Sequence, residues 1–132
     1  TCALPICSRP AYQWSVEVSV YLDSKAHRKG IGRALYAALL EVLRRQGYVR
    51  AFAGITLPNP ASVGLYEAMG FSRIGVFPEI GYKFGQWHDV LWLHLQLRSE
   101  TTPSGPLAAE TILADPEIHS LLERLAQVPQ LS

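Results

Sequence analysis

Cysteine, surplus charge and long apolar runs are all scarce in this chain. The two cysteines, Cys2 and Cys7, lie near the start of a 132-residue chain, so no disulfide framework can staple a core. Twelve Lys and Arg balance eleven Asp and Glu, and a net charge of +1 creates no long-range field toward nucleic acid or an anionic membrane. No apolar stretch reaches the roughly 20 residues of a membrane span. We therefore expect neither nucleic acid nor membrane as a partner.

The start of the chain carries little structural signal. Residues 1–8 lack the basic start, apolar run and small-residue cleavage site of a secretory leader, so we expect a cytoplasmic, soluble protein. The chain begins with Thr1, and no strong pattern precedes about Val16. We therefore expect that the N-terminal part of the fold is missing and that residues 1–8 are an irregular or non-native start.

Hydrophobic periodicity predicts strands that alternate with helices. Residues 16–22 alternate with a period of two, which is typical of a strand with one face in the core. After Gly30 the period becomes helical as far as Gly47, with a broad apolar stripe that consists of Ile31, Ala34, Leu35, Ala38, Leu39, Val42 and Leu43. A strand over 49–56 and a helix capped by Asn59 and started by Pro60 follow.

The rest of the chain divides into two strands and a tail. Strands are predicted over 71–80 and 89–97, with a Gly-rich aromatic connection over 81–88. Alternation of strands and helices favours a parallel part of the sheet, and the last two strands favour an antiparallel addition. We expect one domain over 9–98, then a linker and a short amphipathic C-terminal helix within 99–132, which packs on the domain or on a neighbouring subunit.

A basic glycine-containing segment, residues 27–33, stands between the first strand and the first helix. Its glycines permit a tight turn and close approach to backbone amides, and a helix start attracts anions. The sequence lacks the Gly-Lys-Ser/Thr ending of a nucleotide-triphosphate loop and the third glycine of the dinucleotide fingerprint. It therefore indicates either a site for another phosphate ligand or an ordinary glycine turn with a solvated basic face.

Two motifs in order resemble those of the GNAT acetyltransferases. Residues 28–35, Arg-Lys-Gly-Ile-Gly-Arg-Ala-Leu, are similar to the family's coenzyme A pyrophosphate loop, although His27 replaces the Gln or Arg of its first position. Residues 66–71, Tyr-Glu-Ala-Met-Gly-Phe, are similar to the Tyr-x-x-x-Gly-Phe ending of the next helix. Segments 9–17, 57–59 and 81–90 resemble the phosphinothricin and arsinothricin acetyltransferase branch.

This resemblance implies an α/β (α+β) fold of GNAT type, with a mixed, mostly antiparallel sheet and a central parallel strand pair flanked by helices. It implies that Glu17 is the general base and that Tyr66 protonates the departing thiolate. The residues alone also allow Glu17 to be a solvent-facing strand residue, Tyr66 to be a half-buried aromatic and Asn59 to be a helix cap. The acetyl-coenzyme A (acetyl-CoA) contacts implied by the resemblance are Val20, Tyr21, Leu22, Arg28, Lys29, Gly30, Ile31, Gly32, Arg33 and Asn59.

The implied activity is transfer of the acetyl group of acetyl-CoA to the amino group of a small amino-acid-like acceptor. Phosphinothricin, arsinothricin and methionine sulfone are such acceptors, which would make the protein an antibiotic or herbicide resistance enzyme. The alternatives are acetylation of protein amino groups, an inactive coenzyme-A-binding fragment, and an interaction module without acetyl chemistry. The family's members often form homodimers. We expect no metal, because the four histidines lack ligand spacing with cysteine or carboxylate partners.

Overall fold

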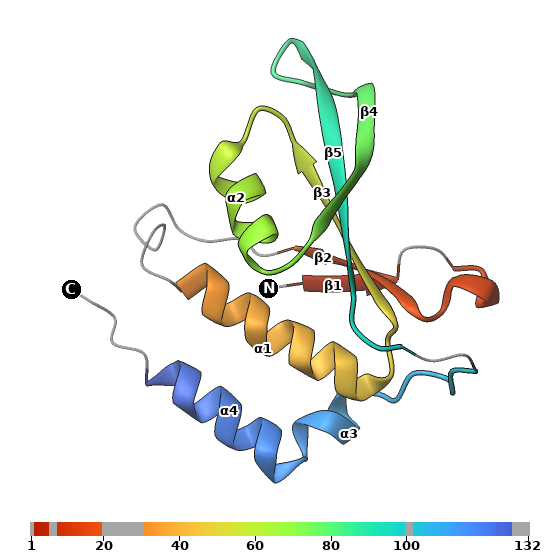
Figure 1. The fold of residues 1–132 in the computed structure, drawn as a ribbon, viewed down its shortest axis with the longest axis vertical. Coiled ribbons are helices and arrows are strands. Elements are labelled where there is room, and N and C mark those ends of the chain that lie inside the picture. Colours follow the sequence, from red (N-terminus) through yellow and green to blue (C-terminus); the bar gives the residue numbers. More distant parts are fainter. Residues whose placement is uncertain (1, 6–7, 20–30, 100–101, 128–132) are drawn as a thin grey trace.

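A five-stranded mixed sheet forms the centre of the molecule (Figure 1). The computed structural model describes residues 2–5, 8–19, 31–99 and 102–127. The elements in chain order are β1 Cys2–Pro5, the 3-10 helix η1 Pro10–Tyr12, β2 Ser15–Ser19, α1 Ile31–Gln46, β3 Arg50–Thr56, α2 Pro60–Ala68, β4 Ser72–Lys83, β5 Gln86–Gln96, α3 Ala109–Leu113 and α4 Pro116–Ala126.

The strand order is β1-β2-β3-β5-β4. β2 and β3 are parallel, whereas β1 with β2, β3 with β5 and β4 with β5 are antiparallel. The predicted fold class, a mostly antiparallel mixed sheet with one parallel pair flanked by helices, is therefore confirmed. The parallel pair arises because α1 crosses over between β2 and β3, and such a crossover returns the chain in the same direction.

The structure corrects the sequence prediction at the first strand. β1 pairs with β2 over four residues, from Cys2 opposite Ser19 to Pro5 opposite Val16. A four-residue strand that ends in proline carries almost no periodic signal, yet proline is acceptable at the edge of a sheet. Pairing with β2, rather than local propensity, accounts for this strand.

The connection predicted over 81–88 is also wrong, because most of it is strand. β4 and β5 form one hairpin whose two-residue turn is Phe84-Gly85, with Lys83 opposite Gln86. Both turn residues have positive φ, 53° and 73°, and such turns match the twist of the flanking strands. Tyr82 packs against Trp87 across the strands, with ring centroids 5.2 Å apart. The glycines and aromatics that suggested a loop therefore belong to the strands and the turn of a long hairpin.

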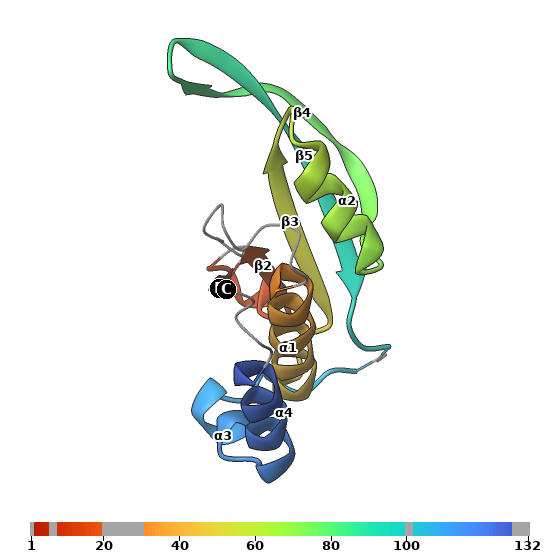
Figure 2. The ribbon, with the colours of Figure 1, turned by 90° about the vertical axis from the view of Figure 1, so that its left-hand side faces the viewer.

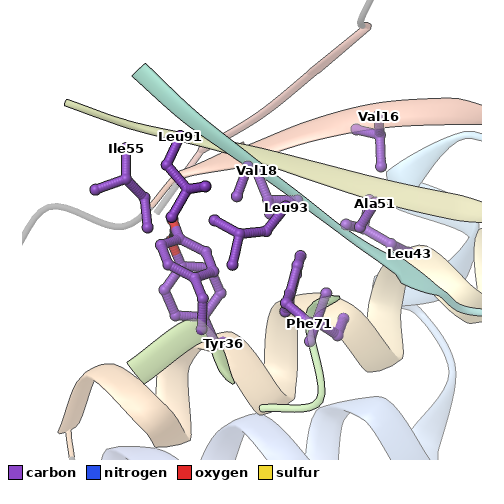
Figure 3. Close-up of a cluster of buried hydrophobic side chains, with 12 residues drawn as sticks. Val16, Val18, Tyr36, Leu43, Ala51, Ile55, Phe71, Leu91 and Leu93 are labelled. Carbon is purple, nitrogen blue, oxygen red and sulfur yellow. Dashed lines mark hydrogen bonds between the residues drawn. The ribbon is translucent and has the colours of Figure 1, made fainter. Parts of the chain in front are cut away.

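The main core lies between one face of the sheet and the helices α1 and α2 (Figure 3). Alternate residues of β2, β3 and β5 point into it, as the period of two requires. The labelled strand residues of Figure 3 include Val16, Val18, Ala51, Ile55, Leu91 and Leu93. The helices contribute Tyr36, Leu40, Leu43 and Tyr66, and Phe71 follows α2.

Helix α1 is buried on two sides, which the prediction of one apolar stripe did not anticipate. Tyr36, Leu40 and Leu43 belong to the main core, whereas Ala38 is buried but lies outside that cluster. Helices α3 and α4 pack on α1, and Figures 1 and 2 both show α4 alongside it. The apolar stripe predicted from the sequence therefore combined residues that face the main core with residues on another apolar side of α1.

The tail after β5 is docked by defined hydrogen bonds. The Trp14 side-chain Nε1 donates to the backbone oxygen of Ser104 at 2.7 Å. Gln46, which is buried, donates its side-chain amide to the oxygen of Leu107 at 3.0 Å, and its backbone oxygen accepts from the Leu107 N–H at 2.7 Å. Residues 102–108 therefore follow a fixed path to the short helix α3, which the sequence did not predict.

An ion-pair network then joins α4 to α1. Arg45 contacts Glu41 at 2.9 Å, Glu117 at 2.9 Å and Asp115 at 3.5 Å. The pKa of Glu41 lies below its ordinary value, chiefly because Arg44 donates hydrogen bonds to the carboxylate. Burial opposes this effect, and a hydrogen bond from Arg45 adds to it. The predicted tail helix is confirmed, with Asp115 as its N-cap, and it packs on the domain itself.

Candidate functional site

The basic glycine segment lies at the start of α1. The helix begins at Ile31, directly after the predicted anion-binding turn, and Gly32 is buried while Arg33 is exposed. The helix start therefore lies where an anion site needs it. The other predicted contacts of this region lie outside the described residues: Val20, Tyr21, Leu22, Arg28, Lys29 and Gly30.

Asn59 caps helix α2. Its side-chain oxygen accepts from the backbone N–H of Ser62 at 3.1 Å, and Pro60 stands at the first turn. Asn59 is exposed. Because the oxygen is engaged in the cap, a cofactor contact by this side chain would come from its NH₂ donors. The interpretation of Asn59 as a cap is confirmed, and the two roles are compatible.

Tyr66 lies in the second turn of α2 and points into the core between the helices and the sheet. It is 7% exposed, so it is more deeply buried than a half-buried aromatic. Its ring packs edge-on against Tyr36, with centroids 4.9 Å apart, and against Phe71, with centroids 5.2 Å apart. The hydroxyls of Tyr36 and Tyr66 are hydrogen-bonded to each other. No motif in the sequence pointed to Tyr36.

Glu17 occupies the middle of β2 and is partly buried. It stands opposite Leu4 of β1 and Phe52 of β3. Its neighbours Val16 and Val18 point to the helices, so Glu17 points to the other face of the sheet. Glu17 and Tyr66 therefore lie on opposite sides of the sheet. Both side chains could act on the same reacting groups only at a gap between two strands.

The parallel strands provide such an opening. The pairing of β2 with β3 runs from Ser15 to Glu17, although β2 continues to Ser19 and β3 to Thr56. Within the part of the chain that the structure describes, Val18 and Ser19 pair with β1 and have no register partner on β3. Among the described residues, the backbone edge of β3 beyond Phe52 therefore has no partner on the β2 side. An extended ligand can hydrogen-bond an unpaired edge of this kind as an added strand does.

The tyrosine pair lies beneath this opening. Ile55 belongs to the part of β3 that continues after β2 has parted from it, and Figure 3 shows Tyr36 beside Ile55 and Leu91. A phenol at this point can donate a proton to a group that enters between the strands. Among the described residues, the site thus combines a helix start, a part of β3 that β2 does not pair with, and a buried phenol on one face of the sheet with a carboxylate on the other.

The face of the sheet that carries Glu17 also holds residues that the sequence analysis did not single out. Phe52 stacks on the ring of His94 with centroids 6.3 Å apart, and the His94 Nδ1 is 3.0 Å from the Arg50 guanidinium. A separate groove of about 510 Å³ between α1 and α4 is lined by residues such as Arg45 and Leu121, and none of the proposed site residues lines it. Among the described residues, no three His, Cys, Asp or Glu side chains gather as a metal site.

A family model matches most of this region. The model of the acetyltransferase (GNAT) domain matches residues 2–92, and the chain therefore belongs to the GNAT acetyltransferase family. The structure agrees with that of a GNAT superfamily phosphinothricin acetyltransferase from Sinorhizobium meliloti in complex with AcCoA. The TM-score is 0.73 and the identity 34%, over 77% of this chain and 56% of that one.

The curated relatives show which members of the family this chain resembles. The chain is 44% identical over 88 residues to a phosphinothricin N-acetyltransferase of Streptomyces coelicolor, which covers 67% of this chain and 52% of the relative. It is 37% identical over 92 residues to an L-methionine sulfoximine/L-methionine sulfone acetyltransferase of Salmonella typhimurium, which covers 70% of this chain and 54% of the relative. The chain spans about half the length of these relatives.

Proposed function

We propose that this chain is an N-acetyltransferase domain. It would bind acetyl-CoA and acetylate the free amino group of a small amino-acid-like acceptor. Phosphinothricin and methionine sulfone are acceptors that fit the names of its relatives. Arsinothricin is a third proposed acceptor, and it rests on the sequence resemblance alone. The observation that carries the proposal is that the pairing of β2 with β3 ends at Glu17, whereas Ile55 of the continuing β3 shares the core with Tyr66. Such an activity would confer antibiotic or herbicide resistance and would operate in the cytoplasm.

The cofactor residues have distinct roles in this proposal. Backbone amides at Gly30 to Gly32, with Arg28, Lys29 and Arg33, would hold the pyrophosphate at the start of α1. The free edge of β3 and the backbone of 20–22 would hold the extended pantetheine arm. Asn59 would donate a hydrogen bond from its side-chain amide. Bound acetyl-CoA supplies the thioester carbonyl that the acceptor amine attacks.

The two catalytic residues would then move protons on either side of the sheet. Glu17 takes a proton from the acceptor ammonium, directly or through water, and so frees the lone pair of the amine. Tyr66 gives its hydroxyl proton to the departing sulfur. Because both groups must return to their starting states, the proton on Glu17 leaves to solvent and Tyr66 regains one. The reaction requires the acceptor and the thioester to meet at the opening between β2 and β3.

Acetylation of protein amino groups is a second candidate. The structure is also similar to a ribosomal-protein-alanine N-acetyltransferase from Brucella melitensis, with a TM-score of 0.69 and 36% identity over 71% of this chain and 58% of that one. A panel of peptide amino termini beside methionine sulfone and phosphinothricin separates the two acceptor classes, because the small-molecule proposal requires the amino acid analogues to react faster.

Calorimetric titration with acetyl-CoA tests the cofactor site. We expect saturable binding to the chain and its loss in Gly32→Glu, because a carboxylate side chain adds bulk and negative charge where the pyrophosphate would lie. Gly81→Glu is the matched control, since the space around Gly81 is open and the residue lies in the β4–β5 hairpin. Equal binding by both variants, or no binding by the unmodified chain, would contradict the proposal.

A further inference from the structure

We propose that Tyr36 is a positioning residue for the acid Tyr66. The inference rests on the proposed function and extends it from helix α2 to helix α1. Tyr36 would hold the Tyr66 phenol in the orientation from which it donates to the departing sulfur and would stabilise the phenolate that this step leaves behind.

Burial and packing leave the two rings little freedom. Tyr36 is 1% exposed and Tyr66 is 7% exposed. The Tyr66 ring has edge-on partners in both Tyr36 and Phe71, at interplanar angles of 63° and 78°. A ring packed in this way is restricted in rotation about both of its side-chain torsions. The position of its hydroxyl is therefore set by its neighbours rather than by solvent.

The hydrogen bond between the two hydroxyls has a required direction in this chemistry. Each phenol has one proton to donate and can also accept. Tyr66 needs its own proton for the sulfur, so Tyr36 must be the donor in their shared hydrogen bond. A donated bond makes the acceptor hydroxyl a better donor in turn, because hydrogen bonds in a chain polarise one another.

The proton balance follows from this arrangement. When the carbon–sulfur bond breaks, its electron pair goes to sulfur, and the Tyr66 proton moves to that sulfur to form the thiol. The negative charge then lies on the Tyr66 oxygen, which keeps the hydrogen bond from Tyr36. Water returns a proton to Tyr66 after the products leave. Tyr36 itself keeps its proton throughout, so it acts through Tyr66.

A merely structural pair makes a different prediction. If the two hydroxyls only join α1 to α2, the loss of one would lower the free energy of unfolding and would leave the bound thiol unaffected. Tyr36→Phe separates the two cases because it keeps the ring packing and removes a single oxygen. Tyr48→Phe is the matched control, because Tyr48 borders the core and lies outside the proposed machinery.

The first measurement needs no acceptor. Coenzyme A is bound to each variant, and the ionisation of its thiol is followed through the ultraviolet absorbance of the thiolate, with the protein alone subtracted. In the unmodified chain we expect the bound thiol to ionise at lower pH than free coenzyme A, since Tyr66 donates to the thiolate. Tyr36→Phe should raise this midpoint by about one pH unit, a tenfold change in the equilibrium. Tyr66→Phe should raise it at least as far.

The second measurement uses turnover with methionine sulfone. We expect Tyr36→Phe to lower kcat about tenfold to a hundredfold, with the Kd for acetyl-CoA unchanged. The double variant Tyr36→Phe/Tyr66→Phe should be no slower than Tyr66→Phe alone, because Tyr36 acts through Tyr66.

The outcomes separate this inference from the proposed function. If the unmodified chain binds no coenzyme A, both fail. If it binds coenzyme A and Tyr36→Phe leaves the thiol midpoint where it was, the cofactor site stands and the role of Tyr36 is refuted. The same refutation follows if Tyr48→Phe moves the midpoint as far as Tyr36→Phe does.

Discussion

Gly54 and Trp92 face each other across β3 and β5, and their contact shows how closely single residues are fitted on the sheet face opposite the helices. A Cβ atom at Gly54 would lie 3.1 Å from the Trp92 ring. Trp92 also packs against Phe77 of β4, with centroids 5.8 Å apart. The indole therefore occupies the space that a side chain at Gly54 would need.

We expect Gly54→Ala to destabilise the chain by about 1–3 kcal/mol, because the indole must move to admit a methyl group. Gly64 in α2 is the matched control, since nothing lies within 4 Å of its Cβ position. Gly64→Ala should stabilise the helix by about 0.5–1 kcal/mol. Urea unfolding of both variants gives the comparison, and an equal change in the two midpoints would show that Trp92 does not restrict Gly54.

Single-residue roles were only partly readable from the sequence. The cap at Asn59 was predictable, because Asn followed by Pro before an apolar helix is a local signal. The partnership of Tyr36 and Tyr66 was not, since the two residues are 30 positions apart and meet only when α1 and α2 share a core. The one available hint was a tyrosine in an otherwise aliphatic stretch of α1. The catalytic role of Glu17 stays a prediction.

At the scale of elements, the structure decides between the two predicted positions of the C-terminal tail, because the tail docks on the domain itself. It lies beyond the family match, which ends at residue 92, yet it covers a face of the helix that follows the proposed cofactor loop. Ile118 of α4 is fully buried, whereas Leu122 is 37% exposed. Ile118 therefore carries more of the apolar contact of the tail than Leu122 does.

Replacing Ile118 should detach the tail. We expect Ile118→Ala to lower the free energy of unfolding by about 2–5 kcal/mol, in line with large-to-small changes at buried sites. Leu122→Ala, the matched control, should cost clearly less. Limited proteolysis provides the second readout, with faster cleavage within 102–115 in the Ile118 variant. Equal loss of stability in the two variants would mean that α4 does not dock through Ile118.

Element types were more predictable than element lengths. The amphipathic pattern of 31–46 and the Asp-Pro start of α4 are local features, and both helices were predicted. The predicted strands of the hairpin were too short because Gly81 and Gly85 suggested a loop. In the structure, cross-strand pairs such as Tyr82 with Trp87 extend both strands. Such pairing is non-local information that a single strand does not contain.

At the scale of the whole molecule, the β4–β5 hairpin exposes large apolar side chains. Phe84 is 90% exposed, Tyr82 64% and Trp87 60%, and Ile74, Phe77 and Ile80 are each about half exposed. Several large exposed apolar side chains on one hairpin favour an interaction site. Figure 1 shows the hairpin extending away from the helices, where a second molecule could approach it. None of the helices in the described ranges is long and apolar enough to cross a membrane.

We therefore predict a homodimer that uses the hairpin. Sedimentation velocity over a range of concentrations should show a monomer–dimer equilibrium, and Ile74→Lys should shift it toward the monomer, because burying a lysine without a partner is costly. Leu113→Lys is the control, since Leu113 is 44% exposed on α3, away from the hairpin. A dimer that is unaffected by Ile74→Lys but lost in the control would place the interface on the tail.

The sequence by itself determined the family, the alternation of strands and helices, and the position of the basic glycine segment at a helix start, because each rests on local pattern or short motifs. Tertiary structure alone decided the pairing of β1, the two-sided burial of α1, the docked tail and the meeting of Tyr36 with Tyr66. These features depend on contacts between residues far apart in the chain. Long-range packing energies, which no local window of sequence contains, select them.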